Sequence, residues 1–102
     1  QNEELYNNFA GKLQETARPL ATGKQKYKNK DGGDVTAEAV CVWTNQYNKK
    51  TNVFATTLGH NNSTVGDDRY LDLVARGLLW SVGKLDDATY RKPANKVLIE
   101  VK

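Results

Sequence analysis

The sequence predicts an α/β chain in which an antiparallel β-hairpin is followed by a helix. Residues 53–58 form a nearly continuous apolar run of strand length. Residues 35–44 precede this run and accumulate β-branched and aromatic side chains, and residues 67–83 follow it with helical periodicity. A strand as apolar as 53–58 needs cover on both faces of its sheet, so a layered arrangement is expected.

The beginning of the chain is predicted to form a short helix over residues 3–15. Leu5, Phe9 and Leu13 recur at intervals of four and would share one face of such a helix. Residues 16–22 contain Pro19, which cannot donate to a central ladder, so this segment suits an edge strand or an extended connection.

Residues 23–34 are rich in Lys, Asn and Gly and are predicted to be a solvated loop that ends in a turn at Gly32-Gly33-Asp34. The loop carries the one dense cationic run of the sequence, formed by Lys24, Lys26, Lys28 and Lys30. Acidic residues follow directly and the net charge is only +3, so no nucleic-acid partner is expected. The sequence also has no apolar run of about 18 residues, so no membrane-spanning helix is expected.

Residues 35–44 and 53–58 are expected to pair as antiparallel strands across a polar hairpin loop at residues 45–52. The single cysteine, Cys41, lies inside an apolar, strand-like run and is predicted to be a buried and inert thiol. Trp43 and Leu58, near the ends of the two strands, are assigned to the core.

The helix over residues 67–83 has start and stop signals at both ends. Asp67 or Gly66 can cap its beginning, and Gly83 stands where a C-terminal cap is expected. Asp72 and Arg76 are one turn apart and are expected to pair.

The same helix is predicted to face the core with an apolar stripe. The stripe consists of Leu71, Val74, Leu78 and Val82 and is widened by Tyr70, Leu73 and Trp80. A glycine in mid-helix costs about 1 kcal/mol relative to alanine. We therefore expect Gly77 to allow close packing against the sheet, with Leu78 and Trp80 in the core.

Residues 97–101 have strand character, but Pro93 and the polar residues before them favour an extension outside the compact core. One strong helix and one weaker helix are too little to cover both faces of the sheet. Another segment, a partner chain or a second copy is expected to supply the missing cover.

Three segments of the sequence resemble the C-terminal half of a ThuA-like (trehalose-utilisation) domain. They are residues 40–47 (VCVWTNQY), 53–61 (VFATTLGHN) and 70–80 (YLDLVARGLLW). Glu3-Glu4-Leu5-Tyr6 and residues 17–22 resemble the segments that precede this half. The resemblance covers roughly residues 3–86, and it implies a domain portion over 1–86 followed by an extension over 87–102.

The resemblance implies membership of the class I glutamine amidotransferase-like superfamily and a flavodoxin-like three-layer sheet. It also implies a role in disaccharide or keto-sugar metabolism, with a small sugar as ligand. Separately from the resemblance, no cofactor and no metal are expected. Because the family domain is longer than this chain, it further implies a complementary N-terminal half, a second copy or a larger assembly as partner.

Amidotransferase chemistry itself is not expected. In true glutamine amidotransferases a Cys nucleophile sits on a strand-to-helix elbow, and a His followed two residues later by Glu completes the triad. His60 resembles that His, but Asn62 stands where the Glu is required. Cys41 lies within a strand and has no glycine elbow.

His60 is the best single candidate for a functional residue, because ligand sites in open α/β sheets lie beyond the carboxyl ends of strands. Imidazole titrates near neutrality, and the side chains of Asn61 and Asn62 both donate and accept, which suits sugar hydroxyls. One hypothesis is a carbohydrate-related site at these residues. In the alternative, His60 only caps the loop or bonds to the next helix, and the chain is a non-catalytic accessory or scaffold module.

A metal site is a weaker hypothesis. His60 with Asp67 and Asp68 would supply too few nitrogen or sulfur ligands for structural zinc. The two aspartates are better explained by the positive end of the helix dipole.

Overall fold

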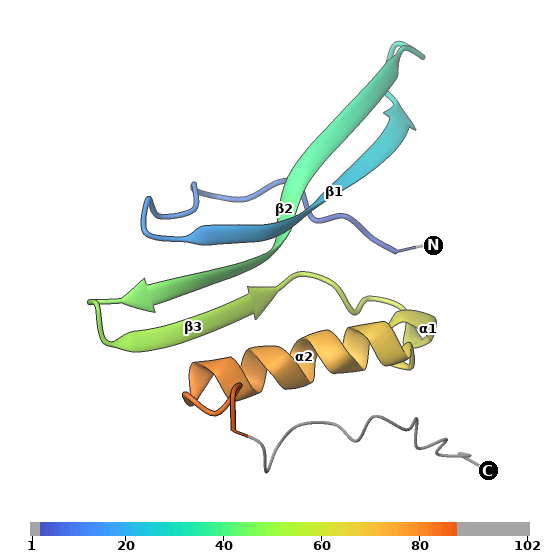
Figure 1. Ribbon diagram of the computed structural model, residues 1–102. Coiled ribbons are helices and arrows are strands. Elements are labelled where there is room, and N and C mark those ends of the chain that lie inside the picture. Colours follow the sequence, from blue (N-terminus) through green and yellow to red (C-terminus); the bar gives the residue numbers. More distant parts are fainter. Residues whose placement is uncertain (1–2, 88–102) are drawn as a thin grey trace, which may run out of the picture.

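The computed structural model describes residues 3–87 and shows a three-stranded antiparallel sheet followed by two helices (Figure 1). The predicted mixed α/β architecture, with a hairpin before a helix, is therefore confirmed. Strand order in the sheet is β1-β2-β3, so β2 is central. The elements are β1 (Arg18–Lys28), β2 (Asp34–Tyr47), β3 (Thr51–Thr56), α1 (Asn62–Val65) and α2 (Asp68–Ser81). The strand expected at residues 97–101 lies outside the described residues.

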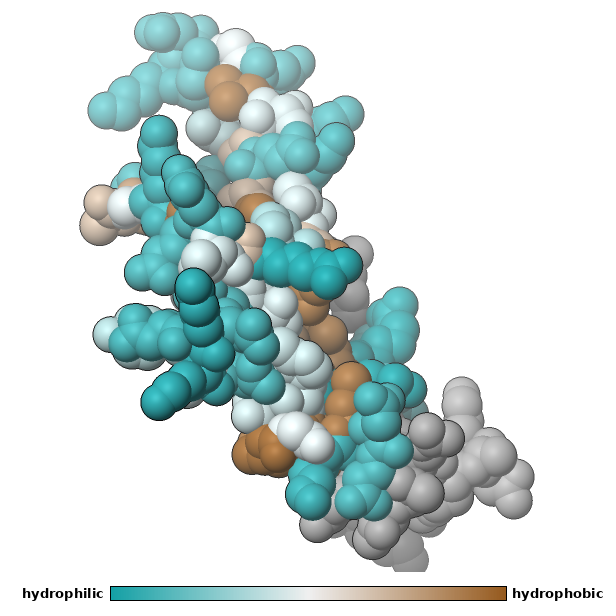
Figure 2. All heavy atoms as spheres, turned by 60° about the vertical axis from the view of Figure 1, so that its left-hand side comes forward, coloured by the Kyte–Doolittle hydropathy of each residue, from teal (hydrophilic) through white to brown (hydrophobic). Residues whose placement is uncertain are grey.

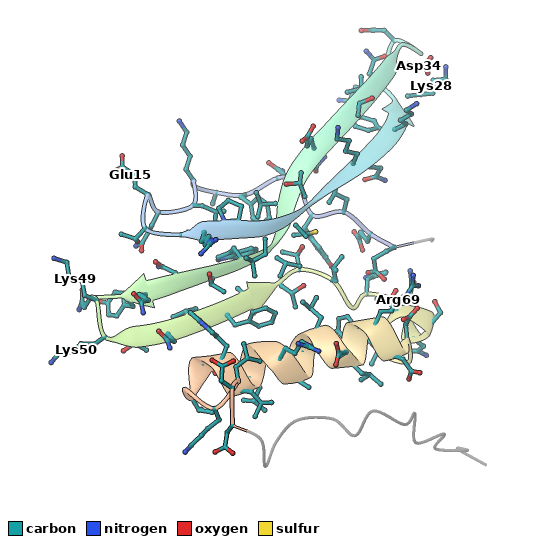
Figure 3. The ribbon with its side chains drawn as sticks, viewed as in Figure 1. Glu15, Lys28, Asp34, Lys49, Lys50 and Arg69 are labelled. Atoms are coloured by element: carbon teal, nitrogen blue, oxygen red, sulfur yellow. The ribbon has the colours of Figure 1, made fainter. Side chains whose placement is uncertain are left out.

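The predicted loop at residues 23–34 is wrong over most of its length, because β1 continues through the lysine run. Alternating lysines follow the period of two of a strand. Cross-strand contacts hold the hairpin: Lys24 Nζ lies 3.7 Å from a Glu38 carboxylate oxygen, and Lys28 pairs with Asp34 (Figure 3). Opposite charges facing each other across a ladder stabilise the pairing. The expectation of an edge strand near Pro19 is confirmed, since β1 is paired on one side by β2.

The turn of this hairpin is built around one asparagine. The side-chain oxygen of Asn29 accepts from the backbone N–H groups of Asp31 and Gly33, at 3.0 and 2.7 Å. Gly32 has a φ of +80°, which a residue with a side chain adopts only with strain. The predicted turn at Gly32-Gly33-Asp34 is thus confirmed.

The predicted antiparallel pairing of the second and third strands is also confirmed, with Thr44 opposite Phe54. The hairpin loop is shorter than expected, because pairing continues to Tyr47 and Thr51. Asn48 and Lys49 reverse the chain at φ values of 50° and 59°, and the Lys50 N–H donates to the Tyr47 carbonyl. Asparagine tolerates this left-handed conformation better than most residues.

Helix α2 begins and ends at the predicted caps. The Asp67 side chain accepts from the Arg69 backbone N–H. At the other end Gly83 has a φ of +72°, and its N–H donates to the Trp80 carbonyl while that of Lys84 donates to the Leu79 carbonyl. This pair of hydrogen bonds is the Schellman motif. The expected Asp72–Arg76 pair is present, with Arg76 Nε 2.9 Å from a carboxylate oxygen.

Gly77 packs directly on the sheet, as predicted. A Cβ atom added there would overlap the ring of Phe54 in β3, so glycine lets the helix approach closely. The face of α2 that contains this glycine, Leu73 and Trp80 is the face that packs on the sheet. Packing distance, and not the number of apolar side chains, therefore sets the orientation of α2.

The predicted core-facing stripe of α2 is wrong. Its four residues turn away from the sheet and are 37–63 % exposed: Leu71 48 %, Val74 37 %, Leu78 63 % and Val82 61 %. Leu78 is consequently not a core residue, whereas Trp43, Leu58 and Trp80 are half-buried. The helix has two apolar faces, and the face with Gly77 is the one that can reach the strands.

Residues 3–15 contain no helix, which corrects the prediction for this segment. They run in extended form across the face of the sheet opposite to α2. Leu5 inserts against Gly23 of β1, where an added Cβ would lie 2.7 Å from Leu5 Cδ1. Phe9 and Leu13 lie near Trp43. Successive side chains of a strand point to opposite faces of the sheet, so Trp43 lies on the face opposite to that of Thr44, which is on the α2 side. The apolar residues spaced by four therefore belong to an irregular segment that covers the sheet, and not to a helix.

The molecule is flat, with principal extents of 55 × 44 × 18 Å. Within the described chain the buried apolar residues are Cys41, at 5 % exposure, and Val42, at 2 %. Apolar side chains accordingly lie at the surface among charged ones (Figure 2). Neither helix described here has the length and hydropathy needed to cross a membrane.

Candidate functional site

His60 lies in the loop that connects β3 to α1, just past the carboxyl end of the strand. The preceding Gly59 has a φ of +112°, and a Cβ there would lie 2.7 Å from the Tyr70 hydroxyl of α2. Backbone conformation and space both require glycine at this position. The loop is thereby fixed between the sheet and the start of α2.

The imidazole of His60 is held by a carboxylate from the beginning of the described chain. His60 Nδ1 lies 2.9 Å from Glu4 Oε2, and both side chains are about half exposed, at 50 % and 48 %. A carboxylate at Nδ1 orients the ring and favours the tautomer with its proton on that nitrogen. The second ring nitrogen, Nε2, is then the hydrogen-bond acceptor of the neutral ring.

The neighbouring Glu3 ties the N-terminal segment to the same loop. One of its carboxylate oxygens accepts the backbone N–H of His60 at 2.7 Å, and the other accepts the hydroxyl of Thr64, a residue that is 6 % exposed. The Thr64 hydrogen bond lowers the pKa of Glu3 below the ordinary glutamate value, and the N–H groups of His60, Asn61 and Gly59 act in the same direction. Partial burial opposes them by raising the pKa. Glu3 is therefore held as a carboxylate.

Asn61 and Asn62, the two predicted ligand-binding residues, begin the short helix α1. The Asn61 carbonyl accepts from the N–H groups of Thr64 and Val65, and the Asn62 carbonyl accepts from the N–H of Gly66. The side chain of Asn61 is half-buried and that of Asn62 is exposed. The backbones of both residues therefore form the first turn of α1, which directly follows His60.

Sequence reasoning missed Glu3 and Glu4 as members of the site. The position two residues after His60, where an orienting carboxylate was sought, holds Asn62, whereas the carboxylate comes from Glu4. The signal available in the sequence was the Glu3-Glu4-Leu5-Tyr6 segment, which carries part of the resemblance. Only the fold shows that this segment meets the histidine loop.

Cys41 takes no part in the site. It is buried in β2, as predicted, and its Sγ donates a weak hydrogen bond to the Ala21 carbonyl of β1 at 3.6 Å. The thiol therefore points along the sheet toward β1.

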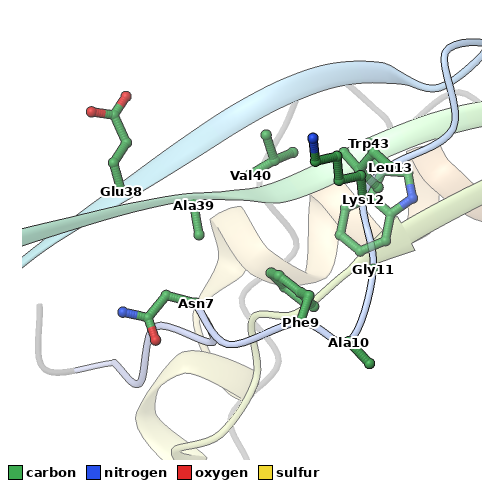
Figure 4. Close-up of a pocket in the computed structure, with 10 residues that line it drawn as sticks. All are labelled: Asn7, Phe9, Ala10, Gly11, Lys12, Leu13, Glu38, Ala39, Val40 and Trp43. Atoms are coloured by element: carbon green, nitrogen blue, oxygen red, sulfur yellow. The ribbon is translucent and has the colours of Figure 1, made fainter.

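A hollow of about 560 Å³ lies between the N-terminal segment and β2 (Figure 4). The rings of Phe9 and Trp43 form part of its wall, and Glu38 and Asn7 stand at its rim. His60 is not among the residues that line this hollow. Among residues 3–87 there is also no group of three or more His, Cys, Asp or Glu side chains placed to hold a metal ion.

The fold and the site together define a mixed α/β protein with a histidine–carboxylate pair beyond the carboxyl end of a sheet strand. The chain belongs to the ThuA family, described as trehalose utilisation, whose model matches residues 1–81. Its function accordingly falls in the area of trehalose utilisation. No curated protein and no solved structure matches the chain.

Proposed function

We propose that this chain contributes His60 to a carbohydrate site that takes a disaccharide or a keto-sugar, with His60 as the proton-transferring group. The observation that carries the proposal is the 2.9 Å contact between His60 Nδ1 and Glu4. A histidine that is oriented through one nitrogen can exchange a proton with a substrate hydroxyl or carbonyl through the other. Membership of the trehalose-utilisation family supports sugar as the ligand class.

Asn61 and Asn62 are proposed to bind sugar hydroxyls beside His60. Each amide side chain donates and accepts hydrogen bonds, as a hydroxyl does, so one residue can satisfy either orientation of the ligand. The exposed side chain of Asn62 is available for this role without breaking the backbone hydrogen bonds of α1.

The sheet is proposed to be part of a flavodoxin-like three-layer sheet of the class I glutamine amidotransferase-like superfamily. In this proposal residues 1–86 form the C-terminal half of a ThuA-like domain and residues 87–102 an extension. The exposed apolar residues of α2 support the idea that a complementary half, a second copy or a larger assembly supplies further cover. A sugar site at His60 would then lie near the junction.

The alternative function is that of a non-catalytic accessory or scaffold module, and one observation favours it. Glu3 and Glu4 both bind the histidine loop and pin the N-terminal segment across the sheet. Contacts of this kind stabilise a fold whether or not a ligand binds.

Calorimetric titration with trehalose and with a keto-disaccharide separates the two functions when combined with thermal unfolding of the same variants. For a sugar site, Glu4→Gln and His60→Gln should weaken binding at least tenfold, about 1.4 kcal/mol, while unfolding temperatures stay near that of the unsubstituted chain. Glu15→Gln, an exposed glutamate away from the loop, is the matched control. Lower unfolding temperatures with no sugar binding by any form would support the scaffold function and contradict the sugar site.

A further inference from the structure

A second hollow, of about 340 Å³, lies at the end of the sheet opposite to the His60 loop. The start of β1, the turn between β2 and β3 and the end of α2 meet there (Figure 1). The six residues of β3, about 20 Å of extended chain, separate this turn from the loop that carries His60. We call this place the turn hollow. Its walls are formed by Thr16, Arg18, Thr44, Asn45, Gln46, Lys49 and Trp80.

The turn hollow is electropositive. Arg18 and Lys49 both line it, and among the described residues of its walls there is no carboxylate. Glu15, the acidic residue nearest to Arg18 in the sequence, does not line it. Within residues 3–87 neither of the two cations is part of an ion pair, whereas Lys24, Lys28, Arg69, Arg76 and Lys84 are. Two cations that share a hollow repel each other unless an anion lies between them.

Lys49 occupies a backbone position that suits glycine better. Asn48 and Lys49 have φ values of 50° and 59° and are the central residues of a turn closed by the hydrogen bond from the Lys50 N–H to the Tyr47 carbonyl (Figure 3). Turns with positive φ at both central residues favour asparagine followed by glycine. A lysine at the second place strains the backbone and brings an ammonium group to the turn hollow.

Arg18 reaches the turn hollow from a backbone position that the sheet fixes. It is opposite Thr44 in the first pair of the β1–β2 ladder. Tyr47, which precedes the turn, lies three residues beyond Thr44, or about 10 Å along β2. Arg18 and Lys49 therefore enter the turn hollow from its two ends, and the space between them suits an anion.

The charges and the polar walls favour a phosphate ester as the ligand. A phosphate monoester carries a charge of about −1.5 to −2 at neutral pH, which matches two cations better than a single carboxylate does. A guanidinium group binds two oxygens of a phosphate in parallel, and an ammonium group binds it as a point charge. The hydroxyl and amide side chains of Thr16 and Gln46 both donate and accept hydrogen bonds, as ligand hydroxyls do.

We propose that the turn hollow binds a small hydroxylated phosphate ester, with Arg18 and Lys49 holding its phosphate group. The volume of about 340 Å³ lies within the range of small-molecule pockets, about 300–1,000 Å³. The site is separate from the proposed sugar site at His60. It holds its ligand by charge and hydrogen bonds and makes or breaks no covalent bond.

Titration of the 102-residue chain with inorganic phosphate, followed through its backbone amide NMR signals, tests the proposal. At an ionic strength of about 0.15 M the screening length is about 8 Å, so distant lysines contribute little. We expect saturable changes in the signals of residues 16–18 and 44–50. Acetate at the same ionic strength should bind at least about fivefold more weakly.

A matched pair of variants locates the anion. Lys49→Gln should raise the dissociation constant for phosphate at least about fivefold, and Arg18→Gln should do the same. Lys50→Gln removes an equal charge from the next residue of the same turn, which does not line the turn hollow, and should leave the constant unchanged.

Lys49→Gly separates binding from a structural role. Glycine removes the backbone strain together with the ammonium group, so the urea midpoint should rise while phosphate binding weakens. Changes that do not saturate, equal affinity for acetate, equal effects at Lys49 and Lys50, or a lower midpoint for Lys49→Gly would overturn the proposal. His60→Gln should leave phosphate binding unchanged, so the proposed sugar site can fail without affecting this result.

Discussion

Glu4 places a carboxylate oxygen 2.9 Å from Nδ1 of His60, although the two residues are 56 positions apart in the sequence. Glu3 beside it binds the backbone of the same loop. One dipeptide therefore orients the histidine side chain and fixes the position of its main chain.

The stability of the chain should fall in acid through Glu3. Its pKa is lowered in the folded protein, mainly by the hydrogen bond from Thr64, so the carboxylate stabilises the fold above the ordinary glutamate pKa of about 4.3. This contribution is lost as the pH falls through the lower, folded pKa. Urea unfolding between about pH 6 and pH 3 should show a steeper loss for the unsubstituted chain than for Glu3→Gln. Parallel curves for the two proteins would contradict this.

Replacing Gly59 should destabilise the loop for two separable reasons. Gly59→Ala puts a side chain at a φ of +112° and within 2.7 Å of the Tyr70 hydroxyl, and we expect a loss of about 1–3 kcal/mol. Adding Tyr70→Phe removes the nearest atom but not the backbone strain, so the double variant should recover only part of the loss. Chemical denaturation of the single and double variants measures both terms, and full recovery would show that strain contributes nothing.

Gly77→Ala should destabilise the protein although alanine is the better helix former. The new methyl group would overlap the Phe54 ring, and overpacking of this kind costs about 1–3 kcal/mol. Gly11→Ala, where nothing lies within 4 Å of the added atom, is the matched control and should be near neutral. A stabilised Gly77→Ala variant in equilibrium unfolding would mean that α2 does not pack at this distance.

Removing the cap of α2 should cost more than removing the neighbouring charge. Asp67 accepts the Arg69 N–H, and its replacement by alanine should cost about 0.5–2 kcal/mol. Asp68→Ala removes a carboxylate from the first turn, where it makes a favourable interaction with the helix dipole, and should cost only about 0.3–1 kcal/mol. Unfolding free energies of the two variants compare these effects directly, and equal losses would argue against a specific capping role for Asp67.

The ends of α2 were predictable from the sequence, whereas its orientation was not. Asp67 and Gly83 act locally, through hydrogen bonds to residues two or three positions away, so their effect is visible in the sequence. The choice between two apolar faces depends on Phe54, which belongs to another element. The periodicity of apolar residues in α2 contains no information on the close approach of Gly77 to this ring.

The lysine-rich hairpin and the N-terminal segment show the same limit. The strand from Arg18 to Lys28 is stabilised by residues of β2, such as Glu38. The composition of residues 23–34 alone predicts a loop, because it does not contain these cross-strand partners. The contact of Glu4 with His60 is likewise created by the fold. The position of His60 after an apolar strand was predictable, because it is a local property of the sequence.

The two tryptophans lie on opposite faces of the sheet. Trp43 lines the hollow under the N-terminal segment, whereas Trp80 lines a groove beside α2 together with Thr44 and Phe54. Each indole therefore senses the polarity of a different layer. In a chain with one tryptophan replaced by phenylalanine, the fluorescence of the other will follow the detachment of its own layer, so the order in which the two layers come apart can be read optically without any added label.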